Sequence, residues 1–198
     1  MPGSFFHTEE KGGVHILRLR SDDGTNRLTK ALILALTEAL RDLASSAKPL
    51  VIGGNDRFFS AGADLAEIAA LTGPSAYDFS RMGQDLTRAL DEFPAPVHAA
   101  ISGYCMGGGL DLALACRNRV ASPLAVFGHR GAALGLITGW GGTQRLPRLI
   151  GKGRALEMFI AAEKISAARA LEIGLIDALA DDPVTEARHR ITRAERRA

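Results

Sequence analysis

Along the chain, stretches in which apolar residues recur at every second position alternate with stretches in which they recur at helical spacing. Residues 14–20 switch between apolar and polar side chains, which is typical of a half-buried strand. Residues 29–46 place leucines at helical spacing behind a candidate N-cap, Thr29. Residues 50–54 then form a short, fully apolar run, as expected of a buried strand. This alternation predicts an α/β fold with largely parallel strand pairing.

The rest of the chain continues the same alternation. The remaining expected helices cover 77–93, 141–151, 152–162 and 166–174. The remaining expected strands cover 97–101, 119–121, 125–128 and 175–176, and a loop is expected at 72–76. No linker rich in Gly, Ser or Pro interrupts these elements. We therefore predict one compact domain over residues 1–182, followed at 183–198 by an arginine-rich helix or a disordered tail.

Composition narrows the class of protein. The 198 residues are 46% hydrophobic with a net charge of +2, and the basic excess is confined to the arginines after Asp182. The body of the chain therefore gives no compositional reason to bind nucleic acid. Two cysteines make neither a disulfide framework nor a metal cluster, and no secretory signal is visible. We expect a soluble cytoplasmic protein without a metal site or a membrane span.

Two stretches, 57–68 and 101–116, each run from a strand through small residues into a helix. The first amides of a helix have no partner inside it and carry partial positive charge. If the fold brings the N–H groups of Ala63 and Gly108 together, they form a two-donor hole for a carbonyl oxygen. Asp111 lies in the first turn of the second helix. Each turn alone is equally consistent with ordinary packing of a helix on a sheet.

These two turns, together with Gly141-Gly142-Thr143-Gln144-Arg145-Leu146, resemble the crotonase superfamily, the enoyl-CoA hydratase/isomerase family. The resemblance runs from about Phe5 to Ala180. It implies a spiral of ββα units, assembled as a homotrimer or hexamer. It also implies an acyl-CoA substrate and no permanently bound cofactor, because coenzyme A is part of the substrate. The family usually continues into a further helical segment, so a shortened C-terminal helical region is expected here.

The resemblance assigns roles to single positions. Ala63 and Gly108 match the amides that hold the thioester oxygen, and Asp111 matches the first of two catalytic carboxylates. The second carboxylate position is Gly131, which has no acidic side chain. The positions matched to substrate or coenzyme A binding, or expected to line the pocket, are Asn26, Arg27, Leu28, Ala61, Asp64, Leu65, Tyr104, Gly107, Gly131 and Trp140. Asp64 is equally consistent with a plain helix cap, and Tyr104 and Trp140 with core packing.

The loss of the second carboxylate leaves two functions open. The first is an acyl-CoA-processing enzyme that stabilises a thioester enolate, with Asp111 as general acid/base. His129 lies close to the vacated position and is a candidate auxiliary base, or a structural histidine. The outcome is open among hydration, isomerisation, decarboxylation, hydrolysis and carbon–carbon bond formation. The alternative is a degenerate acyl-CoA-binding protein without hydratase turnover. A nucleic-acid protein that binds through the arginine tail is disfavoured.

Overall fold

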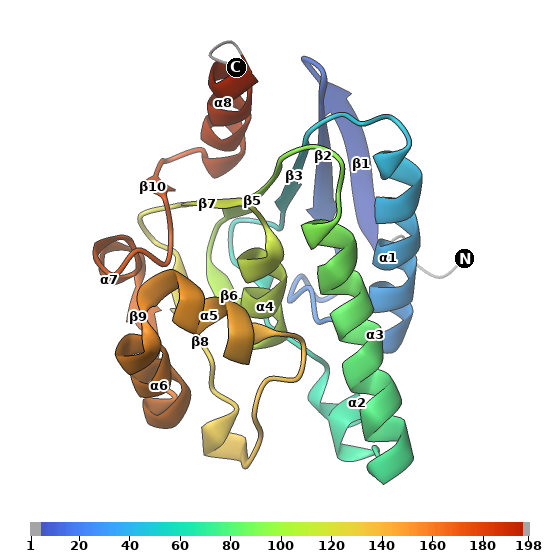
Figure 1. Cartoon of the computed structure of the whole chain (residues 1–198), viewed down its shortest axis with the longest axis vertical. Helices are drawn as coiled ribbons and strands as arrows, with labels where there is room; N and C mark the ends of the chain where they lie inside the picture. Colours follow the sequence, from blue (N-terminus) through green and yellow to red (C-terminus); the bar gives the residue numbers. More distant parts are fainter. Residues whose placement is uncertain (1–4, 196–198) are drawn as a thin grey trace.

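The structure, a computed structural model, describes residues 5–195 and contains two β-sheets (Figure 1). The six-stranded sheet has the order β1 (Phe6–Lys11), β2 (Val14–Leu19), β3 (Leu50–Gly53), β5 (Val97–Ile101), β7 (Asn118–Ala121) and β10 (Ala178–Leu179). The four-stranded sheet has the order β4 (Phe58–Ser60), β6 (Tyr104–Met106), β8 (Val126–Gly128) and β9 (Ile165–Ser166).

The chain winds between the two sheets as a spiral. The successive pairs β3/β4, β5/β6 and β7/β8 each give one strand to the large sheet and the next to the small one. Within each sheet these strands pair in parallel, and only β1–β2 and β8–β9 are antiparallel. The predicted α/β class and the largely parallel pairing are therefore confirmed, together with the spiral of ββα units.

Helices cover the sheets on both sides. They are α1 (Lys30–Ala44), α2 (Leu65–Ala69), α3 (Gly73–Asp91), α4 (Gly108–Ala115), α5 (Gly142–Ile150), α6 (Lys152–Ala161), α7 (Ala167–Glu172) and α8 (Pro183–Glu195), with a 3-10 turn at Ala132–Leu134. Leu32, Leu36 and Leu40 of α1 are buried in the main core against α3, as the helical spacing predicts. α8 packs on the other face of the large sheet, where Ala187 and Ile191 join a smaller apolar cluster.

Two local predictions fail for identifiable reasons. The loop expected at 72–76 is the start of α3, because Pro74 lies in the first turn and the side chains of Thr72 and Ser75 form a capping box. The strand expected at 175–176 is absent, since the N–H groups of Leu175 and Ile176 both donate to the Ala170 carbonyl at the end of α7. The strands β1, β6, β9 and β10 were not anticipated.

The open alternative for the tail resolves to a helix over Pro183–Glu195, and residues 196–198 lie outside the described part. Cys105 and Cys116 are buried core residues, as their apolar surroundings predict, and burial raises the pKa of Cys116 to about 12. Among residues 5–195, no helix is both long and apolar enough to cross a bilayer. The same residues contain no group of three or more His, Cys, Asp or Glu side chains that could hold a metal.

Candidate active site

The two strand–turn–helix stretches lie directly against each other. β4 leads through Gly62 and Ala63 to α2, and the neighbouring strand β6 leads through Gly107 to α4. Gly62 has φ of +97°, and a Cβ on it would lie 2.7 Å from the Met106 carbonyl oxygen and 3.3 Å from the Gly108 nitrogen. Only glycine therefore allows this approach of the two backbones. The fold therefore meets the condition that the sequence left open, namely that the two turns lie together.

Two amides at this junction have no protein acceptor. The neighbouring amides do: Gly62 donates to Ser60 Oγ and Gly107 to the Gly128 carbonyl. By contrast, within the described residues the N–H groups of Ala63 and Gly108 donate to no protein atom. Both residues are partly exposed and both line one cavity, so a ligand bound there can accept from the two amides.

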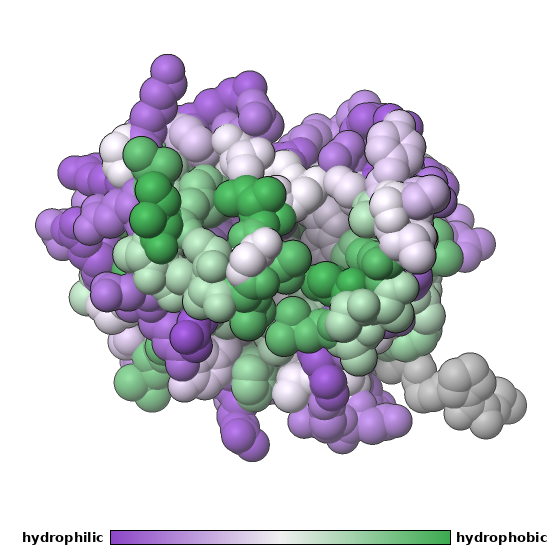
Figure 2. Space-filling model, turned by 90° about the horizontal axis from the view of Figure 1, so that it is seen from below, coloured by the Kyte–Doolittle hydropathy of each residue, from purple (hydrophilic) through white to green (hydrophobic). Residues whose placement is uncertain are grey.

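A cavity of about 700 Å³ opens at these amides, and its lining is mostly apolar. The space-filling view from below shows apolar side chains gathered around the middle of this face, with polar side chains towards its edge (Figure 2). Asp111 is the one carboxylate that lines the cavity among the described residues, and Arg130 and Lys164 are its basic lining residues. A cavity of this size and lining suits an acyl chain with one polar reacting group.

Asp111 is 1% exposed and is held by side chains from outside its own helix. The Thr138 hydroxyl donates to Asp111 Oδ2, and His129 Nε2 lies 3.1 Å from Asp111 Oδ1. His129 is 4% exposed, and its ring packs against Phe159 with centroids 5.2 Å apart. The cavity therefore contains a carboxylate–histidine pair in place of an isolated carboxylate.

Gly131, the vacated carboxylate position, lines the cavity but has no room for a side chain. Its carbonyl accepts from the amides of Leu134 and Leu136, so the chain folds tightly over it. A Cβ built on Gly131 would lie 2.7 Å from the Leu136 carbonyl oxygen. The structure therefore adds a backbone reason for glycine at this position.

Trp140 forms a wall of the cavity and is 4% exposed. A Cβ on Gly108 would lie 2.3 Å from Trp140 Cζ3, and a Cβ on Gly83 of α3 would lie 2.2 Å from Cδ1. The indole is thus clamped between α3 and α4, and its Nε1 donates to the Phe79 carbonyl at 3.3 Å. Because the indole packs directly against Gly108, a displacement of the ring would also shift the Gly108 backbone and its unpaired amide.

The other predicted binding residues fall into two groups. Those that line the cavity are Ala61, Leu65, Tyr104 and Gly107. Asn26 and Leu28 are fully buried, and Asn26 Nδ2 donates to the carbonyls of Phe58 and Phe59. Arg27 lies beside Asp64, whose carboxylate caps α2 through the amides of Ala66 and Glu67. These last contacts are structural, and Asn26, Arg27, Leu28 and Asp64 lie outside the cavity lining.

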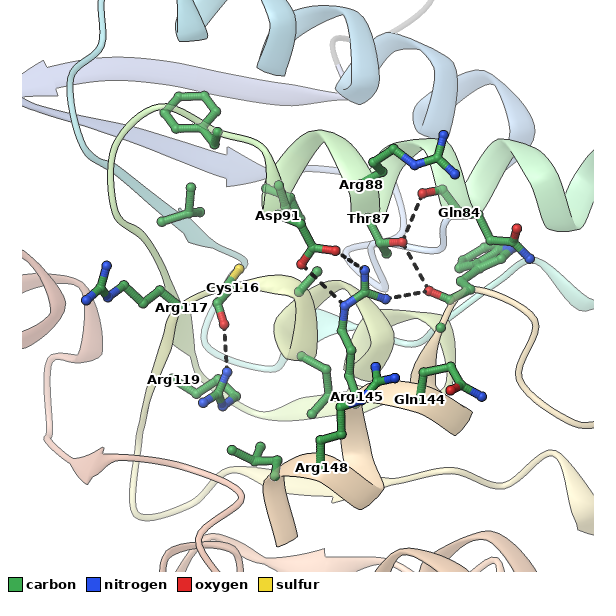
Figure 3. Close-up of a pocket in the computed structure, with 18 of the residues that line it drawn as sticks. Gln84, Thr87, Arg88, Asp91, Cys116, Arg117, Arg119, Gln144, Arg145 and Arg148 are labelled. Atoms are coloured by element: carbon green, nitrogen blue, oxygen red, sulfur yellow. Dashed lines mark hydrogen bonds and ion pairs between the residues drawn. The ribbon is translucent and has the colours of Figure 1, made fainter. Parts of the chain in front are cut away.

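A second, larger cavity of about 1120 Å³ lies on the other side of Trp140 and is rich in arginines (Figure 3). Arg145 pairs with Asp91 and donates to the Trp140 carbonyl at 3.3 Å. Arg119 donates to the Cys116 carbonyl at 2.7 Å and pairs with Asp177. The buried guanidinium of Arg119 and the partly buried one of Arg145 are both held by protein acceptors, and none of the four buried unpaired side-chain atoms of residues 5–195 lines this cavity.

Sequence reasoning missed Thr138. This residue lies in the Gly- and Ala-rich segment 129–142, which has no hydrophobic period that would fix the direction of a side chain. No signal in the sequence pairs it with Asp111, because the contact joins residues 27 positions apart through an irregular loop.

Comparison with known proteins gives the family. Residues 9–197 match the family model described as enoyl-CoA hydratase/isomerase. The chain is 40% identical over 160 residues to a probable enoyl-CoA hydratase of Bacillus subtilis, covering 79% of this chain and 62% of that protein. It is 35% identical over 172 residues to a crotonyl-CoA hydratase of Syntrophomonas wolfei, covering 85% of this chain and 66% of that protein.

Comparison with solved structures gives the same family. The fold matches Pseudomonas aeruginosa DspI with a TM-score of 0.92 at 32% identity, covering all of this chain and 77% of that one. It matches an enoyl-CoA hydratase from Bacillus anthracis with a TM-score of 0.88 at 33% identity, covering 98% of this chain and 76% of that one. The chain thus spans about three quarters of these structures, with the same fold throughout. On sequence and on structure alike, it belongs to the enoyl-CoA hydratase/isomerase family.

Proposed function

We propose that this protein is an acyl-CoA-processing enzyme of the enoyl-CoA hydratase/isomerase type. A thioester carbonyl oxygen would accept hydrogen bonds from the amides of Ala63 and Gly108, which strengthen as an enolate forms. The observation that carries this proposal is that both amides, adjacent in space and bordering an apolar cavity, have no protein acceptor. Asp111 and the neighbouring His129 are the candidate groups for proton transfer.

The same proposal includes the family's general properties. The substrate is an acyl-CoA, no cofactor is permanently bound, and the protein assembles as a homotrimer or hexamer. Light scattering of the purified protein measures the assembly directly. Of the residues matched to binding, Ala61, Leu65, Tyr104 and Gly107 are proposed to contact substrate from the cavity wall.

One observation favours a second function, acyl-CoA binding without hydratase turnover. Hydration in this family is expected to use two carboxylates, and Gly131 has neither an acid nor the space for one. The deciding experiment follows the loss of ultraviolet absorbance when a short enoyl-CoA is hydrated, beside an isomerisation assay with a 3-enoyl-CoA. Turnover in either assay supports the enzyme.

The matched variants are Asp111→Asn in the cavity and Asp85→Asn on α3, where the carboxylate is 43% exposed. Both remove one carboxylate charge with little change of shape. We expect turnover to fall about 10²–10⁴-fold in Asp111→Asn and to be unchanged in Asp85→Asn. Binding of coenzyme A without turnover would instead support the second function, and absence of binding would overturn both.

A further inference from the structure

Asp111, His129 and Thr138 come from three separate segments and meet at one wall of the cavity. Thr138 donates to Oδ2 of Asp111, and His129 Nε2 faces Oδ1 at 3.1 Å. Oδ2 is thus held by a hydrogen bond, and Oδ1 lies within ion-pair distance of the ring without a well-aligned hydrogen bond. A carboxylate held in this way is better placed to fix a neighbouring ring than to swing towards a substrate atom.

The start of α5 is shaped around this pair. A Cβ on Gly142 would lie 2.1 Å from Asp111 Oδ1 and 3.1 Å from His129 Nε2, so glycine leaves the space in which the two groups meet. Gly142 is also the first residue of the nine-residue helix α5, whose N-terminus places partial positive charge beside the carboxylate. The helix start therefore leaves room for the carboxylate next to the ring and places partial positive charge beside it.

The two ring nitrogens of His129 have different surroundings. Nε2 is buried and makes no well-aligned hydrogen bond, although Asp111 Oδ1 is close. Nδ1 is not among the enclosed unpaired atoms, and no protein atom in residues 5–195 holds it. Since His129 lines the cavity and Phe159 packs against its ring, Nδ1 is the nitrogen left for a ligand.

We propose that His129 is the catalytic base of this site, and that Asp111 and Thr138 are positioning residues that hold its ring. This assignment rests on the proposed function. It gives proton transfer to His129 and the positioning of the ring to Asp111 and Thr138. In this proposal the neutral imidazole has its proton on Nε2, the nitrogen next to Asp111 Oδ1, and its lone pair on Nδ1. The tautomer is set by the carboxylate, as in other carboxylate-oriented histidines.

The proton step is balanced within the site. A C–H bond next to the thioester carbonyl breaks, and its proton forms the Nδ1–H bond of an imidazolium. The electron pair moves into an enolate, whose oxygen is held by the amides of Ala63 and Gly108. Asp111 compensates the positive ring. Return of the proton to the same or a conjugated carbon restores the neutral ring, so no second carboxylate is needed.

The charged groups around the ring define the expected pH dependence. Asp111 is the titratable group in contact with it, and Arg130 and Lys164 are the other charged residues lining the cavity. Thr138 and Phe159 contribute no charge. Because only the neutral imidazole can take a proton, turnover should fall on acidification as His129 becomes protonated.

The kinetic test compares His129→Gln, Thr138→Val and Thr138→Ser. We expect kcat to fall about 10²–10⁴-fold in His129→Gln, with its acid limb lost from the pH profile. Thr138→Val should lower kcat about tenfold or more at unchanged KM, and Thr138→Ser should restore it. If His129→Gln turns over at the wild-type rate, the assignment of His129 is overturned while the proposed function stands.

A spectroscopic test does not depend on finding the substrate. Nitrogen-15 NMR of the imidazoles, assigned with the His129→Gln spectrum, should show the Nε2-protonated tautomer of His129 at neutral pH. Thr138→Val should change that tautomer balance and the midpoint of its titration, with thermal melting to confirm folding. An Nδ1-protonated His129 in the wild type, or a titration indifferent to Thr138, would overturn the proposal.

Discussion

Four buried side-chain atoms in residues 5–195 lack a hydrogen-bond partner, and they divide equally between two regions. Asp111 Oδ1 and His129 Nε2 lie at the cavity, whereas His98 Nδ1 and Arg188 Nε lie on the side of the large sheet that α8 covers. In the cavity the two atoms face each other at 3.1 Å beside two unpaired amides. The unpaired groups there converge on one space.

On the α8 side the two unpaired atoms, His98 Nδ1 and Arg188 Nε, do not face a common cavity. His98, 5% exposed, lies on β5, and burial lowers its pKa to about 4, so the ring is neutral. Arg188 instead reaches across to donate to the Lys11 carbonyl at 3.1 Å. Burial of a polar group is thus common to both regions, and convergence on a cavity distinguishes the proposed active site. An unpaired buried atom by itself signals a cost in stability.

The largest expected effect is on the cavity side. In Gly108→Ala the new methyl would press on Trp140 Cζ3 and displace the first turn of α4, which moves the unpaired amide. Loss of one such donor lowers turnover by about 10²–10³-fold. The measurement is kcat on whichever enoyl-CoA the wild type converts, normalised to folded protein.

Gly83→Ala is the matched control, because its methyl presses the same indole from α3, at 2.2 Å from Cδ1. Alanine in a helix interior usually stabilises by up to about 1 kcal/mol relative to glycine. Here the clash should reverse that sign and cost about 1–3 kcal/mol. If Gly83→Ala loses as much turnover as Gly108→Ala, the ring and not the amide explains both losses.

A second prediction concerns Gly131. Gly131→Glu restores an acid to the position that the family resemblance marks as vacant, yet its Cβ would lie 2.7 Å from the Leu136 carbonyl oxygen. We expect no gain in hydration and a loss of stability of about 3 kcal/mol, since the clash is with backbone. Urea unfolding and the hydration assay measure the two effects.

Gly131→Ala separates the clash from the charge. It should lose similar stability without adding an acid, because the clash involves the Cβ that both variants carry. A gain of hydration in Gly131→Glu alone would show that the loop opens to admit a second carboxylate, and would return catalysis to a pair of acids.

Backbone features of this site could be predicted from the sequence, and side-chain contacts could not. The small residues between strand and helix marked two turns in which backbones can approach closely, although whether Ala63 and Gly108 meet was left open. Asp111 was identified by its place in the first turn of a helix. Its partners were not, because Thr138 lies in a segment without period and its direction depends on tertiary packing.

The starts of the helices show the same difference between features that the sequence predicts and features that it does not. Thr29 caps α1 through the Leu32 amide, as its position before a leucine stripe predicts. At the start of α3 the same chemistry was misread as a loop, because Gly73 and Pro74 outweighed the capping residues around them. Local signals that agree are predictive, and those that compete are resolved only by the contacts of the folded chain.

The smallest expected effect tests the α8 side. Unfolding exposes His98 and returns its pKa from about 4 towards the ordinary histidine value of 6.5. Between these values the unfolded chain binds a proton that the folded chain does not, so stability must fall as the pH decreases. From pH 7 to pH 5 this one group should cost at most about 2 kcal/mol.

His98→Gln removes that titration and should flatten the acid side of the stability curve by the same amount. Asp177 and the Ala187 backbone favour the charged ring, while Arg117 and Arg190 oppose it, and burial outweighs them all. Urea unfolding at pH 7 and pH 5 gives the change in unfolding free energy with pH for both proteins. This change does not depend on any constant loss of stability that the substitution itself causes. Parallel slopes would show that α8 yields enough to hydrate a charged His98, and the two regions would then differ in rigidity as well as in chemistry.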